Sequence, residues 1–212
     1  MPPTAHFNEL KQRVDELGSH MLPVIKPGLT YTPAEHDCVR AYVLLVHAEV
    51  ETFLEQRVKG EVACRIAAWD AAGTPSVVLM GLLAFHDGVW VDAIESLTSP
   101  VEGDKKNPTW SSRDVDTRLR KCQTQTVYAL NNNNGIKAKD VLDMLLRLGF
   151  RVGDIDSDLI SQLDALGTDR GNFAHNAVRA VTNQPDPALA KAQVTEIVDK
   201  LQELDVRISA LV

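Results

Sequence analysis

The sequence predicts one all-α domain spanning residues 1–212, a helical bundle, and three observations lead to this fold class. Apolar residues recur at three- and four-residue spacing along most of the chain, helix-capping residues precede several of these segments, and proline or glycine separates them. One interruption, within residues 73–112, is treated as an insertion into the bundle. With 212 residues and 44% hydrophobic content, the chain is long enough to bury one core.

Two helices are predicted in the N-terminal part of the chain. Residues 4–20 have the pattern of a short amphipathic helix that ends near Gly18, and a proline- and glycine-rich connection follows at 23–28. The next helix has a specific start, because Thr32 precedes a proline and Glu35 completes a T-x-x-E capping box. Its apolar stripe continues for about seven turns, so we expect a long central helix.

The segment after this helix has two interpretations. Residues 61–72 are expected to continue the helix until the Gly-Thr-Pro break at 73–75. The apolar run 77–85, followed by His-Asp-Gly and another apolar stretch, is either a β-hairpin on the Asp-Gly turn or a buried helix followed by a loop. Residues 98–112 have the composition of a loop.

The C-terminal part of the chain predicts further helices. They cover residues 116–130, 137–148, 155–166, 172–182 and 187–211. The asparagine run 131–134 is interpreted as a solvated turn, and Gly167 as a helix stop. Asp186 followed by proline caps the last helix, whose apolar residues from Val194 to Leu211 step alternately by three and four. This heptad seam fits bundle packing or a partner helix.

Composition excludes most familiar enzyme classes. The three cysteines are far apart and lack metal-ligand spacing, and the chain has no P-loop, HExxH, GxSxG or dinucleotide fingerprint. No metal and no cofactor is therefore expected. The net charge of −7 disfavours nucleic acid binding as a whole, but residues 105–179 hold 12 Lys and Arg against 9 Asp and Glu, whereas the remainder holds 10 against 20. The part of the chain that is less repulsive to an anion contains the motif described next.

No targeting segment is recognised in the sequence. The N-terminus lacks the basic, apolar and small-residue pattern of a signal peptide, and the longest apolar run, at 77–85, is too short to span a bilayer. We therefore expect a soluble, cytoplasmic protein without a membrane partner.

The stretch RGNFAHN at 170–176 is the main candidate site. If residues 172–182 are helical, His175 lies about 60° beyond the edge of the apolar arc, with Asn172 and Arg179 on the same polar side. The histidine is either an ordinary exposed residue beside a core face or an acid–base group that is presented to a ligand.

Arg170 raises a separate question about the same motif. A helix extended backwards would put this arginine in the middle of the apolar arc, where an unpaired guanidinium is costly. Either the helix begins after Gly171, or the arginine points into an interface that holds an anion or a carboxylate. A cation, an amide and an imidazole together suit metal-free RNA cleavage, in which His175 moves the 2′-hydroxyl proton and Arg170 stabilises charge on the phosphorane.

The long central helix supplies a second polar group. His47 and Glu51 are four residues apart on the flank of its apolar face, with Arg40 above them. A carboxylate placed there could orient an imidazole or an arginine from another helix. The alternative is a local salt network at the solvent edge.

The order of these segments resembles the HEPN superfamily of α-helical proteins. The resemblance rests on the R-x4-H motif RGNFAHN, the preceding LISQLDALGTD and the earlier YVLLVHAEVETFLE. The passage NNNNGIKAKDVLDMLLRLGF is similar to the RiboL-PSP and MAE_28990-like branches of that superfamily. The resemblance covers residues 33–60 and 115–182 and implies a HEPN-like helical bundle.

The resemblance implies an activity and a set of partners. Many HEPN proteins are metal-independent endoribonucleases in which two R-x4-H motifs meet across a homodimer and leave a 2′,3′-cyclic phosphate. They recur in toxin–antitoxin, abortive-infection and antiviral defence systems, so an antitoxin or a defence-system protein is an expected partner beside RNA. On matching positions, Arg170 and His175 become the catalytic pair. Asn172, Glu51 and His47 become supporting residues, and Arg179 an RNA-binding one.

The motif departs from the family pattern at two positions. Gly171 stands where asparagine, aspartate or histidine is common, and Ala177 replaces the tyrosine of the R-x4-H-x-Y form. Some HEPN domains are inactive modules, so a non-catalytic helper that binds a protein or a nucleotide is the alternative function. A third expectation is a purely structural bundle that assembles through the heptad seam.

Overall fold

The all-α prediction is confirmed by the computed structural model, whose described residues contain helices and no strand. The described residues are 2–26, 30–86, 114–175 and 184–211. The elements are α1 (Ala5–Met21), α2 (Pro33–Ala72), α3 (Val77–Phe85), α5 (Val115–Asn131), α6 (Ala138–Arg147), the 3₁₀ turn η2 (Val152–Asp154), α7 (Ser157–His175) and α8 (Pro187–Ser209).

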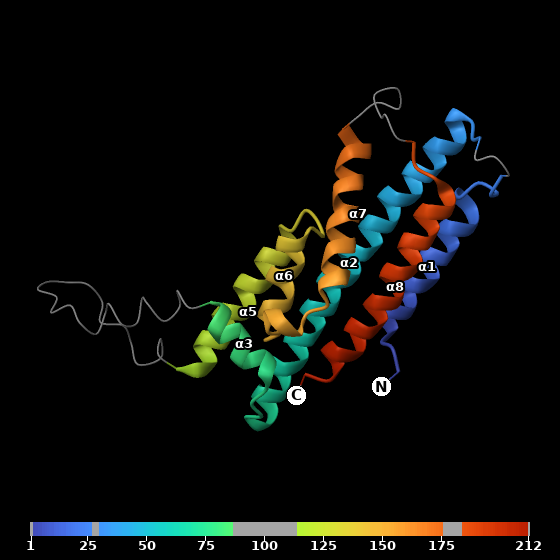
Figure 1. The fold of residues 1–212 in the computed structure, drawn as a ribbon. Coiled ribbons are helices and arrows are strands. Elements are labelled where there is room, and N and C mark those ends of the chain that lie inside the picture. The colour runs from blue at the N-terminus through green and yellow to red at the C-terminus, as the bar shows by residue number, and fades with distance from the viewer. Residues whose placement is uncertain (1, 27–29, 87–113, 176–183, 212) are drawn as a thin grey trace, which may run out of the picture.

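The 40-residue helix α2 organises the bundle, because it contacts every other α-helix of the described residues. Figure 1 shows α1, α7 and α8 running alongside α2, while α3, α5 and α6 gather around its C-terminal part. One continuous cluster of buried apolar side chains fills the space between these helices. The chain therefore builds its core around one long axis.

The predicted helix starts are confirmed where capping residues specified them. The Thr32 side chain accepts a hydrogen bond from the Glu35 backbone amide, and the Glu35 side chain accepts one from the Thr32 amide, which completes the capping box. Asp186 caps α8 with Pro187 at the first helical position. At its C-terminus α2 ends at Gly73, whose φ of 62° requires a residue tolerant of the left-handed region.

Residues 77–85 adopt the helical alternative and belong to the bundle. Val78, Leu79 and Leu82 of α3 are buried in the core. Helix α3 passes so close to the C-terminal end of α6 that the two backbones touch. A Cβ atom on Gly81 would lie only 2.4 Å from the Gly149 Cα atom, so this position has no room for a side chain. The part of the predicted insertion at 87–112 lies outside the described residues.

Helix α7 corrects one prediction, since it runs without a break from Ser157 to His175. Gly167 was predicted to end a helix, and that prediction is wrong. Gly167 is instead buried where α7 passes the start of α6, and a Cβ there would lie 3.1 Å from the Lys137 Cγ atom. Glycine thus allows a close approach, and its helix continues because packing against α2 outweighs the modest helix penalty of one glycine. Residues 176–182 of the predicted helix 172–182 lie outside the described residues.

The heptad seam of α8 packs inside the chain. Its members Val194, Ile197, Leu201, Leu204 and Ile208 are buried, and the last member, Leu211, is partly buried against the same core. Of the two uses predicted for this seam, the structure therefore has bundle packing, and assembly through these side chains would require the bundle to open.

A buried polar network joins three helices at the end of the bundle where both termini lie (Figure 1). The fully buried Asp205 accepts hydrogen bonds from the Thr4 backbone amide at 2.7 Å, the Thr4 hydroxyl at 2.9 Å and the Arg57 Nε atom at 2.7 Å. Arg57 also donates to Glu61 and to Ser209. The network fixes α1 and α8 against α2.

Within the described ranges, no single helix has the length and apolar character needed to cross a membrane. The pair α2 and α3 passes by length and composition only, and it is bent by 111° at the break between the two helices.

Candidate functional site

Helix α7 brings Arg170 against the central helix. Because α7 continues through Gly171, the helix does not begin after that glycine, and the arginine takes the other predicted course into an interface that holds a carboxylate. Arg170 is half-buried and close enough to His47 and Glu51 of α2 to influence the pKa of both groups. The sequence-predicted residues Arg170, His47 and Glu51 are thus brought together.

His47 is a neutral imidazole in this arrangement. Its side chain is buried, with a residue exposure of only 2%, and burial lowers its pKa to about 4, with the nearby positive charge of Arg170 acting in the same direction. Its Nδ1 atom lies 3.7 Å from the Glu51 Oε2 atom. At neutral pH His47 is uncharged, so its contact with Glu51 is not an ion pair. The buried His47 therefore does not form the salt network at the solvent edge that was the alternative interpretation.

Glu51 lies between several groups of opposing effect. Burial raises its pKa most, the neighbouring carboxylates Glu55 and Asp140 raise it further, and the Arg170 charge lowers it. Arg170 is the only cation among these influences. The positive charge of Arg170 therefore acts on both Glu51 and His47.

Asn133 is a member of this cluster that sequence reasoning missed. Its Nδ2 group donates to Glu55 Oε1 at 3.0 Å, to Glu51 Oε1 at 3.3 Å and to the Gly135 carbonyl at 2.9 Å. The other three asparagines of the run are exposed as predicted, but Asn133 is half-buried. One feature of the sequence indicates that the end of the run approaches the core. The Gly-Ile pair that follows the asparagines is buried.

Arg40 contacts the last turn of α7. Its guanidinium lies 5.6 Å from the centre of the Phe173 ring, and its Nη2 atom donates to the Gln184 Oε1 atom at 3.2 Å. Asn172, the residue before Phe173, is exposed. This contact fixes the helical turn that ends at His175.

The remaining motif residues are placed only in part. His175 is the last residue of α7, but its side chain lies outside the described residues, as does Arg179. On a continuous helix, residues five apart leave the axis about 140° apart and about 7.5 Å along it. Arg170 and His175 of one chain therefore start from different sides of α7.

Metal ligation has no candidate in the part of the chain that the structure describes, where no group of three or more His, Cys, Asp or Glu is arranged to hold an ion. Cys38 and Cys64 are exposed and Cys122 is buried, all three as free thiols. Comparison of the chain with known proteins finds no matching family model, no matching curated protein and no matching solved structure.

Proposed function

We propose that this protein is a metal-independent endoribonuclease of the HEPN type, with Arg170 and His175 as the catalytic pair. The observation that carries the proposal is the position of Arg170. It is a half-buried cation on α7, close enough to Glu51 and His47 of α2 to influence the pKa of both, and it lies five residues before the histidine of its own R-x4-H motif. A guanidinium is suited to binding a phosphate.

The reaction follows from the two side chains. His175 removes the proton from a ribose 2′-hydroxyl, and the oxygen attacks the adjacent phosphorus. Arg170 stabilises the negative charge that develops on the phosphorane. The bond from phosphorus to the 5′-oxygen then breaks, and a protonated imidazole supplies the proton to the leaving oxygen. The products are a 2′,3′-cyclic phosphate and a 5′-hydroxyl.

Two protomers are part of the proposal. The directions of Arg170 and His175 differ by about 140° on a continuous α7, so one chain does not readily aim both at one phosphate. A homodimer with two adjacent motifs supplies one imidazole as base and the other as acid. Asn172 is exposed within the motif and would contact the RNA, and Arg179 would bind the backbone phosphates.

Cleavage of a labelled single-stranded RNA in the presence of EDTA tests the proposal. We expect His175→Ala and Arg170→Ala each to lower the cleavage rate by at least about 100-fold. Arg151→Ala is the matched control, because it removes an exposed arginine outside the motif. The wild-type rate per protomer should fall on dilution below the dimer dissociation constant. An unchanged rate in His175→Ala would reject the catalytic assignment.

The alternative is a non-catalytic HEPN helper, and one observation favours it. The charge of Arg170 already has a carboxylate of the same chain beside it, Glu51, and the whole chain carries a net charge of −7. A helper would cleave no RNA under any of these conditions, and Arg170→Ala would leave its binding to a protein or nucleotide partner intact.

A role as a toxin or antiviral effector is proposed on the same basis. Induced expression of the wild-type chain should arrest growth of the host cell, whereas His175→Ala should not. If both variants arrest growth equally, the effect does not come from RNA cleavage at this site.

A further inference from the structure

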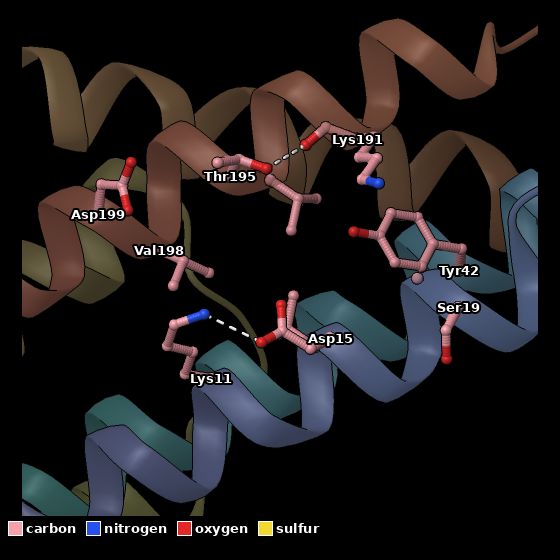
Figure 2. A pocket seen from close by; sticks show the side chains of 11 residues that line it. Lys11, Asp15, Ser19, Tyr42, Lys191, Thr195, Val198 and Asp199 are labelled. Carbon is pink, nitrogen blue, oxygen red and sulfur yellow. Dashed lines mark hydrogen bonds and ion pairs between the residues drawn. The ribbon is translucent and has the colours of Figure 1, made fainter. Parts of the chain in front are cut away.

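The cavity between α1, α2 and α8 carries charges of both signs. Figure 2 shows Lys11 and Asp15 from α1 together with Lys191 and Asp199 from α8, and the Lys11 Nζ atom lies 2.9 Å from the Asp15 Oδ2 atom. The lining therefore favours neither an anion nor a cation.

His86 lies at the C-terminal end of α3 and takes no part in the proposed RNA cleavage. It is the C-cap residue of that helix and is half-buried. Its Nε2 atom lies 3.0 Å from the Nη1 atom of Arg147 on α6 and 3.1 Å from the Oγ1 atom of Thr126 on α5. One ring nitrogen therefore joins the end of α3 to two other helices.

The two contacts fix the protonation state of the His86 ring. A guanidinium can only donate, so Nε2 accepts the hydrogen bond from Arg147 and carries no proton. The hydroxyl of Thr126, a residue that is 0% exposed, then donates to the same nitrogen. Both hydrogen bonds exist only while the imidazole is neutral.

Arg147 makes a second proton on this ring unfavourable. The residue is 9% exposed, and its guanidinium lies 4.2 Å from the centre of the Phe85 ring. Among the residues that the structure describes, no carboxylate lies within ion-pair distance of it, and Asp143 acts on it from further away. A proton on Nε2 of His86 would break both hydrogen bonds and place two cations 3.0 Å apart.

The electrostatic environment acts in the same direction. Burial, followed by the charge of Arg147, lowers the pKa of His86 below its ordinary value of 6.5. Arg147 is the only charged group among the described residues that acts on this ring. Cys122, one turn before Thr126 on α5, is an uncharged thiol, because burial raises its pKa.

We propose that His86 is an acid-sensitive latch that holds the C-terminal end of α3 against α5 and α6. While the ring is neutral, the hydrogen bonds from Arg147 and Thr126 keep the latch closed. When the ring takes up a proton, the two cations repel and the last turn of α3 moves away, so that water solvates the imidazolium. The buried Val78 and Leu79 keep the first turn of α3 in the core, which confines the opening to the end of the helix.

The opening has a defined direction with pH. In the open state the solvated ring regains its ordinary pKa of about 6.5, whereas its pKa is lower in the closed state. Between these two values the open state binds more protons, so a fall in pH favours opening by up to about tenfold for each pH unit. Above pH 6.5 both states are neutral and the latch stays closed.

Hydrogen exchange of the full chain tests the latch, because it resolves the end of α3 from the rest of the bundle. Protection factors of residues 82–86, corrected for the intrinsic pH dependence of exchange, are compared at about pH 7 and pH 5. His86→Gln is the decisive variant, since the glutamine oxygen still accepts from Arg147 and Thr126 but does not titrate. We expect protection to fall by about tenfold more in the wild type than in His86→Gln.

The controls separate this effect from other histidines. The wild type and His86→Gln both retain His47, so the difference between them comes from His86. His6→Gln, which removes an exposed histidine of α1, should respond to pH as the wild type does. An equal fall in protection at residues 82–86 in the wild type and His86→Gln would overturn the proposal.

An NMR titration of the His86 ring in the wild type decides the matter even if His86→Gln does not fold. The pKa should lie below 6.5, with Nε2 unprotonated at neutral pH. The measurement includes any charge of Asp87, which lies outside the described residues. Arg147→Gln keeps a donor and removes the charge, so it should raise the pKa of His86, whereas Lys139→Gln, at an exposed lysine of α6, should not. A pKa of 6.5 or above, or a proton on Nε2 at neutral pH, would refute the latch.

Discussion

Removal of the Asp205 carboxylate should destabilise the bundle more than any surface change. Asp205 is 0% exposed, and it accepts hydrogen bonds from Arg57 and from two groups of Thr4. In Asp205→Ala the guanidinium of Arg57, itself 5% exposed, loses one of its two carboxylate partners, and the start of α1 loses its attachment to α8.

The expected cost can be worked from these contacts. Breaking a buried ion pair by removing one partner costs about 3–5 kcal/mol. Arg57 keeps Glu61 at 3.0 Å and Ser209 at 2.7 Å, so the lower end of that range applies, about 3 kcal/mol. Asp205→Asn preserves the shape and one acceptor, and hydrogen bonds to charged groups are worth about 1.5–3 kcal/mol, so we expect a smaller loss in that variant.

Urea unfolding followed by circular dichroism measures the difference. With slopes of about 1–3 kcal/mol per molar urea, Asp205→Ala should lower the midpoint by about 1–3 M at unchanged slope. Asp15→Ala is the control, because its ion pair with Lys11 is exposed and should contribute nothing measurable. A loss below about 1 kcal/mol in Asp205→Ala would refute the reasoning, since it would mean that water or movement solvates Arg57 at little cost.

Two further predictions concern packing and pH. Gly81→Ala should lower the melting temperature by several degrees, because the new Cβ would lie 2.4 Å from the Gly149 backbone and α3 would have to move away from α6. Gly60→Ala is the control. A Cβ at this helical position would have nothing within 4 Å, so the substitution should not destabilise the protein. His47 should make stability fall with acidity. Its folded pKa of about 4 lies below the ordinary value of 6.5, so between these pH values the unfolded chain binds more protons and the free energy of unfolding drops, by up to about 1.4 kcal/mol per pH unit. Above pH 6.5 the effect vanishes. Urea titrations of the wild type and His47→Gln measure it, and parallel stability profiles from pH 6.5 to 4.5 would contradict the assigned pKa.

Local sequence signals determined most of the helices. The capping box at Thr32 and the Asp-Pro pair at 186–187 satisfy backbone groups within one turn, so they fix a helix start wherever the helix packs. Apolar spacing likewise identified the buried face of α8 before its neighbours were known. These features depend on residues three or four positions apart, and that range is visible in the sequence.

Contacts between helices could be decided only by the tertiary structure. Gly167 has the local character of a helix stop, yet α7 continues through it because packing against α2 and α6 outweighs a local preference. The sequence left two directions open for Arg170, and its approach to Glu51 depends on how α7 lies on α2. Asn133 joins Glu51 and Glu55 across about 80 residues of chain, and no periodicity or motif reports a contact at that separation. Sequence thus determined the helices and their faces, whereas the packing of those faces decided which polar groups meet.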